Sequence, residues 1–361
     1  MRIDEVSPEL PVAIWAPDGT ITFEVPSHWH FGEATELLYM EGLGYYCTPN
    51  HRIPYKTGDN STIRVRTACE LKAQARIPRT GLYEGSLQPT PEELAYIVAF
   101  QADGHYDVKR DSIQFEFQKT RKIERLTQIL DTLRIPYTKS IVRRGATTFY
   151  IPKGKHGLSK DLKHFGEWLL QLSGKALDFI LEELEFWDGW RSPQGELWYS
   201  SSVKSNCDWI TTIAALRGKR ARWLSPDLRG TKPNYRVTIA PEKGKYSETV
   251  AQKTDQRGLV GCPTVSTGFF LLRYKGEISV TGNSTVGIVI NRAWLNFHSR
   301  LPEVQVLLQV HDSLAGQFPT HRANVLLPKM LECSRIVIPY DDPLIIPTGV
   351  KTSTISWGDC Q

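Results

Sequence analysis

The chain has 361 residues, a formal net charge of +5 and an apolar content of 40%, which suits two or three globular domains. No apolar run approaches the ~20 residues that span a bilayer, and the start of the chain has no apolar signal segment. The six cysteines lie far apart without a CxxC pair, which argues against structural zinc and a disulfide framework. We therefore expect a cytoplasmic protein without a membrane partner.

Positive charge is concentrated in the middle of the chain. Residues 105–165 contain 14 Lys and Arg against 6 Asp and Glu. A second basic cluster follows, made of Arg217, Lys219, Arg220, Arg222, Arg229, Lys232 and Arg236. A local excess of this kind is usually a solvated face, but two of them in one segment also suit a partner with a phosphate backbone.

The pattern of predicted strands and helices changes three times along the chain. Residues 1–88 read as short strands with turns, for example 12–16 and 21–25 around a Pro-Asp-Gly turn. Residues 89–242 alternate helices and strands, and residues 243–283 return to short strands. Residues 284–361 combine a helix (286–297), a strand (304–310) and a Pro-rich tail. The order predicts a β domain that is interrupted by an α/β domain and then resumed.

The α/β segment begins with a strong helix signature. Thr90 is a suitable N-cap, Pro91 suits the first helical position, and Glu93 completes a capping box. The apolar run ends in Asp103, and Gly104 is expected to stop the helix. A strand at 112–117 and an amphipathic helix at 121–133 follow.

The same order recurs further along. An apolar helix starting at 174 ends in Asp188-Gly189, and a strand (196–202) and a helix (206–216) follow it. A single Asp-Gly is most simply a helix stop. Two copies, each followed by a strand and a helix, indicate an internal duplication.

These two segments resemble the paired motifs of LAGLIDADG homing endonucleases. The resemblance implies an α/β fold in which two helices pack side by side and present Asp103 and Asp188 to Mg²⁺ and the phosphates of double-stranded DNA. The sequence departs from the family in its second helix, where small or apolar residues are usual and where it has Glu182, Glu183, Glu185 and Trp187. The chain could therefore keep the fold and yet have lost DNA cleavage activity.

The flanking β segments resemble the Hint module of inteins. Thr48-x-x-His51 is similar to the block that activates the upstream splice junction, with a His of pKa near ~6.5 as proton donor. Cys262 occupies a position in a downstream block that often holds Asp. Taken alone, Thr48-x-x-His51 is a weak signal, because a single His is more often structural.

The segment then ends in Gly282-Asn283-Ser284, which is a turn when taken by itself. By resemblance, the amide nitrogen of Asn283 attacks its own carbonyl and Ser284 accepts the acyl group. Gly282 stands where inteins usually have His, so His51 or a water would have to assist this cleavage.

An intein opens with a nucleophilic Cys or Ser, which this chain does not show at Met1. Ser7 is a poor candidate because Pro8 follows it. The resemblance therefore implies a split intein, whose short N-intein fragment is fused to the N-terminal half of the host protein on another chain. A truncated or inactive remnant is the alternative.

Residues 284–361 resemble the C-terminal palm of family-A DNA polymerases, particularly those of phages. In Val310-His311-Asp312, Asp312 would bind a catalytic Mg²⁺, and Ser313 stands where many members have Glu. A chance His-Asp turn is the simpler alternative.

The expected fold is therefore multidomain: a mainly-β Hint (horseshoe) module (1–88 and 243–283), an inserted LAGLIDADG α/β domain (89–242) and an α+β palm fragment (284–361). The expected function is protein trans-splicing with an inserted DNA endonuclease, in a bacterial or phage-infected cell. Two alternatives remain open. One is a standalone endonuclease with an inactive splicing module, and the other is a polymerase accessory fragment that binds DNA without covalent change.

Overall fold

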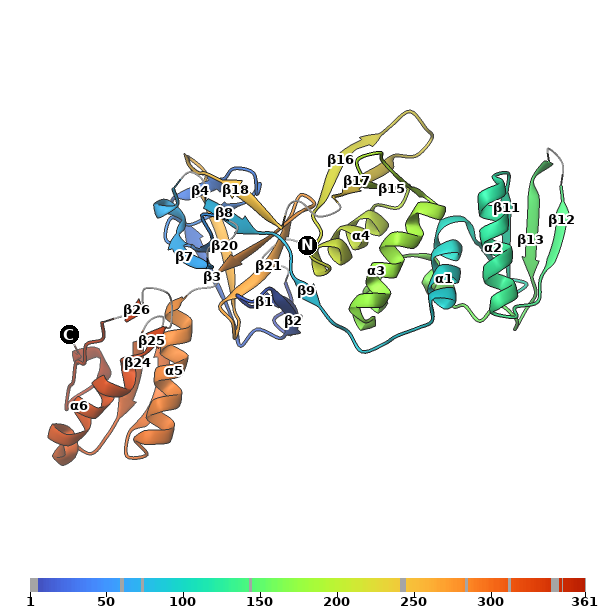
Figure 1. Cartoon of the computed structure of the whole chain (residues 1–361). Helices are drawn as coiled ribbons and strands as arrows, with labels where there is room; N and C mark the ends of the chain where they lie inside the picture. The colour runs from blue at the N-terminus through green and yellow to red at the C-terminus, as the bar shows by residue number, and fades with distance from the viewer. Residues whose placement is uncertain are drawn as a thin grey trace.

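The computed structural model describes residues 6–58, 62–72, 75–142, 145–240, 245–282, 285–310, 313–338, 344–345 and 347–360. Figure 1 shows three parts: a β-rich part in the middle, an α/β part built from residues in the centre of the chain, and a C-terminal part. Among the described residues, no helix has the length and apolar character needed to cross a membrane.

The β-rich part is assembled from two stretches of sequence. Its strands before the α/β part are β1 (Val12–Trp15), β2 (Thr20–Glu24), β3 (His28–Ala34), β4 (Leu37–Met40), β5 (Tyr46–Cys47), β6 (Arg52–Tyr55), β7 (Arg64–Thr67), β8 (Ala75–Pro78) and β9 (Leu82–Tyr83). After it come β18 (Tyr246–Thr249), β19 (Ala251–Thr254), β20 (Gly258–Thr264), β21 (Phe269–Tyr274) and β22 (Glu277–Gly282).

Strands from the two stretches pair with one another. The antiparallel pairs β1–β21, β3–β20, β4–β19 and β8–β18 each join an early strand to a late one. The largest sheet has the order β22-β21-β1-β2-β9, and Trp15, Ile21, Phe269 and Val280 form a buried cluster on it. These pairs therefore join the two stretches across the intervening α/β part.

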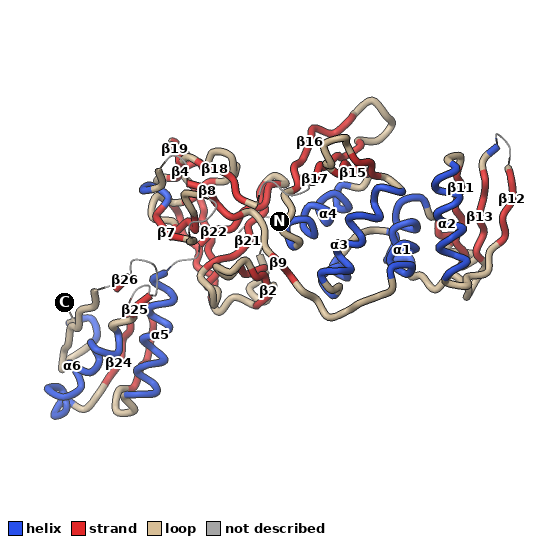
Figure 2. The backbone as a smooth tube through the Cα atoms, viewed as in Figure 1, coloured by secondary structure: helices blue, strands red, loops and turns tan. Residues whose placement is uncertain are grey.

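The α/β part repeats one pattern twice. The first copy is α1 (Pro91–Asp103), β10 (His105–Asp107), β11 (Ser112–Phe117), α2 (Thr120–Thr132), β12 (Thr138–Ile141) and β13 (Thr147–Ile151). The second is α3 (Gly174–Glu183), β14 (Gly189–Arg191), β15 (Leu197–Ser201), α4 (Lys204–Leu216), β16 (Ala221–Asp227) and β17 (Asn234–Ile239). The sheets have the equivalent orders β10-β11-β13-β12 and β14-β15-β17-β16, so the duplication is confirmed (Figure 2).

The start of α1 follows the expected chemistry. The backbone N–H of Glu93 donates to Thr90 Oγ1 at 3.3 Å, and the backbone N–H of Thr90 donates to Glu93 Oε2 at 2.8 Å, which is a capping box. Gly104 ends the helix for a different reason than a left-handed stop, because its φ is −71°. A Cβ there would lie 2.4 Å from Phe100 Cδ2.

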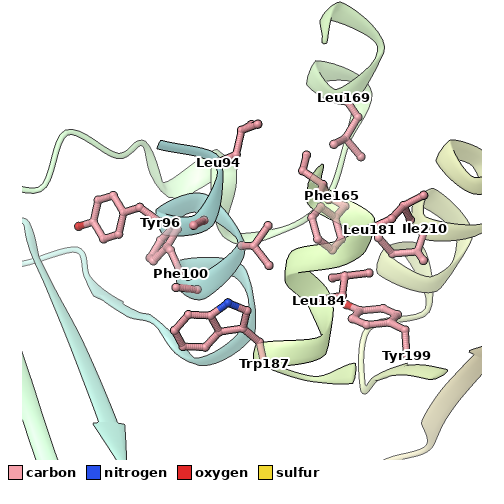
Figure 3. Close-up of a cluster of buried hydrophobic side chains, with 14 of the residues drawn as sticks. Leu94, Tyr96, Phe100, Phe165, Leu169, Leu181, Leu184, Trp187, Tyr199 and Ile210 are labelled. Carbon is pink, nitrogen blue, oxygen red and sulfur yellow. The ribbon is translucent and has the colours of Figure 1, made fainter. Parts of the chain in front are cut away.

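The second motif helix is shorter than the sequence predicts. The α-helix α3 ends at Glu183 and continues as a 3₁₀ turn, Leu184–Phe186. α3 packs beside α1, and one buried cluster runs through both copies. Figure 3 shows Phe100, Trp187 and Leu184 from the two sides of this contact. The cluster is what holds the ends of α1 and α3 near each other.

The C-terminal part comprises α5 (Thr285–Arg300), β23 (Gln305–Val310), β24 (Ser313–Gln317), α6 (Ala323–Ser334), β25 (Val337–Ile338) and β26 (Leu344–Ile345). It has its own small core, made of Phe297, Leu301, Val304, Leu326 and Cys333. The helix and strand expected at 286–297 and 304–310 are both present.

Candidate functional sites

The two aspartates of the duplicated motif meet at one lysine. Asp103 is the last residue of α1, and Asp188 follows the 3₁₀ turn that extends α3. Lys122 Nζ, from α2, lies 2.5 Å from Asp103 Oδ2 and 3.6 Å from Asp188 Oδ1. The structure therefore places both predicted carboxylates in one site, bridged by a single ammonium group.

A second lysine borders the same site. Lys163 Nζ donates hydrogen bonds to the carbonyl oxygens of Phe100 and Gln101, both at 2.9 Å. Burial lowers the pKa of Lys163, while the charges of Asp103 and Asp188 raise it. In the sequence both lysines are only members of the basic stretch 105–165, with no local signal that sets them apart.

The environment of Asp188 favours its neutral form. Burial raises the pKa of Asp188, the negative charge of Asp103 adds to the shift, and Lys122 and Lys163 oppose it. Two carboxylates that share a site and raise one pKa are typical of catalytic acid pairs and of metal sites.

Two of the four residues that depart from the resembled motif, Glu183 and Trp187, form a buried support behind this pair. Glu183 is 2% exposed and accepts hydrogen bonds from Arg125 Nε at 3.0 Å and Arg125 Nη2 at 2.6 Å. Trp187 Nε1 donates to the same carboxylate at 3.0 Å. Glu183 and Trp187 therefore join α3 to α2, whereas Glu182 is exposed and Glu185 pairs with Arg191 on the surface.

The donor set suits a hard divalent cation when phosphate is present. Among the residues that the structure describes, no group of three or more His, Cys, Asp or Glu is arranged for a metal. Mg²⁺ is commonly held by one or two carboxylates together with substrate phosphates and water. Asp103 and Asp188 fit that requirement, while a tight metal site made by the protein alone does not fit.

The two sheets turn one face to the helices and the other outward. In the second copy, Leu197, Tyr199 and Val237 are buried, so the alternating residues lie on the outer face. Trp198, Thr238 and Arg222 are neighbours across three strands on that face. Trp190 and Trp198 stack there with ring centroids 5.4 Å apart.

Much of the second basic cluster has a structural role rather than a free cationic surface. Arg217 Nη2 and Lys219 Nζ contact Asp178 at 2.8 and 3.2 Å, and Arg229 Nη2 contacts Asp227 at 2.6 Å. Arg220 Nη2 lies 3.8 Å from Glu277 of the β-rich part. Ion pairs within the protein thus occupy four of the seven members of this cluster, and a phosphate-backbone partner for the cluster stays a prediction.

A second site lies in the β-rich part around His51. The backbone N–H of His51 donates to Thr48 O at 3.0 Å, which closes the Thr-x-x-His turn. His51 Nε2 lies 2.6 Å from Thr281 Oγ1, and Tyr45 Oη donates to the same hydroxyl at 3.4 Å. Thr281 and Tyr45 were not singled out from the sequence, because only the fold brings β22 beside this turn.

His51 is a weaker base than a histidine in water. Burial, and then the positive charge of Arg52, lower its pKa from 6.5 to about 4. The expectation of a pKa near 6.5 is therefore wrong. At neutral pH the ring is uncharged, and it can accept or donate one hydrogen bond without carrying a charge.

The structure explains the glycine that precedes Asn283. Gly282 ends β22, where a Cβ would lie 2.4 Å from the backbone oxygen of Arg52. A histidine side chain at this position would require the β6 backbone to move. The close approach between β22 and β6 thus suits glycine, and no larger residue, at position 282.

The remaining predicted residues are placed only in part. Cys262 lies in β20 opposite His30 of β3, and its Sγ is 3.9 Å from the carbonyl oxygen of Pro263. Asn283, Ser284 and Asp312 lie outside the described residues. The roles assigned to these four residues stay predictions.

No protein-family model matches this chain. A curated relative, the ribonucleoside-diphosphate reductase subunit beta of Aquifex aeolicus (strain VF5), is 31% identical over 224 residues, which cover 56% of this chain and 32% of the relative. The chain thus spans about a third of the length of this relative.

Three solved structures are similar to part of the chain. Mesophilic variants of the homing endonuclease I-DmoI are 13% identical, with 42% of this chain and 89% of that chain covered and a TM-score of 0.30. The N-terminal LAGLIDADG domain of DUF199/WhiA is 12% identical, with 43% and 78% covered and a TM-score of 0.31. Full-length DUF199/WhiA from Thermatoga maritima is 14% identical, with 44% and 54% covered and a TM-score of 0.32. Scores of this size do not establish a shared fold, so the site is interpreted from its own geometry.

Proposed function

We propose that the α/β part is a LAGLIDADG-type DNA endonuclease that depends on a divalent metal ion. One observation carries the proposal. Asp103 and Asp188, from equivalent positions of two structural repeats, both contact the ammonium group of Lys122. In phosphodiester hydrolysis, a divalent ion activates the attacking water and neutralises the leaving oxygen. Asp103 and Asp188 would hold such an ion together with the phosphates of DNA.

The other residues of the site have separate parts in this proposal. Lys122 and Lys163 supply positive charge beside the carboxylates, where the scissile phosphate would add negative charge. Arg222 and Trp198 lie on the outer face of the second sheet, which suits contact with a phosphate backbone and with sugars. Glu183 and Arg125 hold the helices in place.

The test is cleavage of a plasmid that carries the uninterrupted host gene, in which the coding sequences on either side of the proposed insertion are joined. With Mg²⁺, we expect cutting near the joining point, and with EDTA none. Asp103→Asn and Asp188→Asn should each lower the rate at least 100-fold, on the order expected for loss of a catalytic electrostatic group. Asp131→Asn, which changes an exposed acid on α2, is the matched control. Full activity of the double Asp103→Asn, Asp188→Asn variant would refute the assigned roles.

We propose, as a second function, that the β-rich part is the C-terminal portion of a split intein that cuts after Asn283. The favouring observation is the 2.6 Å contact between His51 Nε2 and Thr281 Oγ1. Thr281 is two residues before Asn283 in the sequence, so the Thr-x-x-His turn lies beside the end of β22. In this reaction the Asn283 side-chain nitrogen attacks the Asn283 carbonyl carbon. The bond to Ser284 then breaks and leaves a succinimide and a free Ser284 amine.

The β-rich part would supply position rather than strong acid-base groups. A strand end held against β6 restricts the approach of the side chain to the carbonyl, which can give a high effective concentration. Neutral His51 can hydrogen-bond a group at the junction, and Thr48 and Cys262 stay candidates for the upstream step. The upstream nucleophile would come from the N-intein partner chain, and Ser284 would accept the acyl group.

The curated relative is consistent with an intervening element. Its match is too long to lie within residues 284–361 alone, and it covers only 32% of an enzyme subunit. A segment shared with part of a much longer enzyme is what insertion into different host genes would produce. Residues 284–361 would then belong to the host, and we keep a family-A polymerase palm with Mg²⁺-binding Asp312 as the proposed identity of that host fragment.

The splicing proposal is tested by mixing the chain with a short N-intein fused to a reporter protein. Ligation of the reporter to a fragment that begins at Ser284 supports it, and mass spectrometry identifies the new bond. Asn283→Ala should abolish release, whereas Asn296→Ala, in the C-terminal part, should not. Absence of both ligation and cleavage after Asn283 with every N-intein tried would leave the endonuclease as the standing function.

A further inference from the structure

The ammonium group of Lys122 occupies the place between the two carboxylates that a metal ion would need. Its Nζ contacts Asp103 at 2.5 Å and Asp188 at 3.6 Å, and the residue is only 8% exposed. The Trp187 ring lies on another side, with its centroid 6.0 Å from Nζ. An ammonium group held in this way neutralises the same charges that attract a divalent cation.

The helix that carries Lys122 is itself held firmly. Arg125 lies three residues further along α2 and makes a two-point contact with the buried carboxylate of Glu183. Arg121 Nη1 donates to the carbonyl oxygen of Glu185 at 3.1 Å. Because α2 is attached at these two points, a change of the Lys122 side-chain rotamer is the simplest way for its ammonium group to leave the carboxylates.

We propose that Lys122 is a built-in competitor of the divalent ion, which must leave at least one of the two aspartates before a metal can bind there. The inference rests on the proposed endonuclease function and adds a form of control to it. In the DNA-free chain, Lys122 keeps metal affinity low. When a DNA phosphate enters, it offers the ammonium group a new partner and the metal additional oxygen ligands.

The experiment measures metal binding without DNA. Mn²⁺ alone is titrated into the full chain, and free Mn²⁺ is followed by electron paramagnetic resonance. Lys122→Met, which keeps the length of the side chain and removes its charge, should bind Mn²⁺ about tenfold or more tightly than the wild type, equivalent to about 1.4 kcal/mol. The gain should vanish when Asp188→Asn is added.

Lys119→Met is the matched control, because Lys119 is exposed at the start of the same helix. It removes one charge nearby without touching the aspartates, and its affinity should stay within about twofold of the wild type, as expected for a screened charge. Thermal unfolding with and without Mn²⁺ shows that Lys122→Met is folded, and its Mn²⁺-dependent rise in Tm should exceed that of the wild type. If Lys122→Met does not fold, Lys122→Gln replaces it.

Equal or weaker Mn²⁺ binding by Lys122→Met, or by Lys122→Gln in its place, overturns the proposal. This result is separable from failure of the endonuclease. Tighter Mn²⁺ binding by Lys122→Met, together with no DNA cleavage by the wild type, supports the competition and refutes the nuclease. Unchanged Mn²⁺ binding by Lys122→Met, together with Mg²⁺-dependent cleavage by the wild type, refutes the competition and supports the nuclease.

Discussion

The buried ion pair between Glu183 and Arg125 gives the sharpest test of the packing between α2 and α3. Glu183 is 2% exposed on its side chain and Arg125 is 20% exposed, with a shortest contact of 2.6 Å. Removing one partner leaves the other charge buried, whereas removing both leaves an apolar contact. The equivalent residue of the first copy, five positions before its aspartate, is the fully buried Val98, so Glu183→Val is compatible with this type of helix contact.

The structure sets the magnitudes. Arg125→Met leaves the Glu183 carboxylate with a hydrogen bond from Trp187 Nε1 but without its cation, and we expect a loss of about 3–5 kcal/mol in the free energy of unfolding. Glu183→Val leaves the indole N–H unpaired and should cost about 1–3 kcal/mol. The double variant should cost about as much as Glu183→Val alone, so the two changes should be non-additive by about 3–5 kcal/mol, the whole cost of Arg125→Met.

The assay is unfolding in urea, followed by circular dichroism and by tryptophan fluorescence, because a chain of several domains requires agreement between two probes. Lys119→Met, at the start of the same helix, is the control. Lys119 is exposed, so the change should cost about 0.5 kcal/mol or little more. Additive effects of Arg125→Met and Glu183→Val, or a cost of Arg125→Met as small as that of the control, would refute the reasoning.

Three further predictions concern other parts of the chain. Thr90→Ala removes the acceptor for the Glu93 N–H and should lower stability by about 1 kcal/mol, measured as a shift of the urea midpoint. Gly282→Ala places a Cβ against the Arg52 carbonyl oxygen and should cost about 1–3 kcal/mol; by mass spectrometry, release after residue 283 should also be slower, and unchanged release would contradict the proposed strand position. His51 has a folded pKa of about 4, below its usual 6.5, so its contribution is complete above pH 6.5 and is lost as pH falls toward 4, up to about 3 kcal/mol. His51→Gln should therefore show a flatter pH dependence of stability between pH 4 and 6.5, and an unchanged dependence would show that His51 is not the titrating group.

Local chemistry made the α/β part readable from the sequence. The Thr90 capping box, the Asp-Gly helix ends and the alternation in 112–117 depend on residues within a few positions of each other. The repetition of this order located Asp103 and Asp188, which the structure then places together. The predicted length of the second α-helix is too great. Leu184–Phe186 forms a 3₁₀ turn, which the apolar periodicity does not distinguish from an α-helix.

The partners of these residues could not be read in the same way. Lys122 and Arg125 appeared only as members of a basic stretch, and nothing local indicates that one reaches the aspartates and the other a buried glutamate. Thr281 gains its meaning from a contact with His51, 230 positions away. The same holds for Arg220, which looked suited to phosphate and lies instead near Glu277 of the β-rich part.

The interleaving of the β-rich part sets an order of events during synthesis. In the described part of the chain, β1, β3, β4 and β8 each pair with a strand among β18 to β21, and Ile14, for example, pairs with Phe270. At about 5–20 residues per second, the stretch of roughly 200 residues between β9 (Leu82–Tyr83) and the end of β22 (Glu277–Gly282) takes about 10–40 s to make. The α/β part can fold in that interval, while the early strands wait with unpaired edges that favour association with other chains.

The contact between His51 and Thr281 is consequently among the last to form. Any chemistry at residue 283 is thereby delayed until nearly everything before it has been synthesised. Because closure of the β-rich part has to await its last strand, factors that slow synthesis or that cap exposed strand edges should affect its yield more than that of the α/β part. The late position of β22 in the sequence thus sets the earliest time at which the His51–Thr281 contact can form.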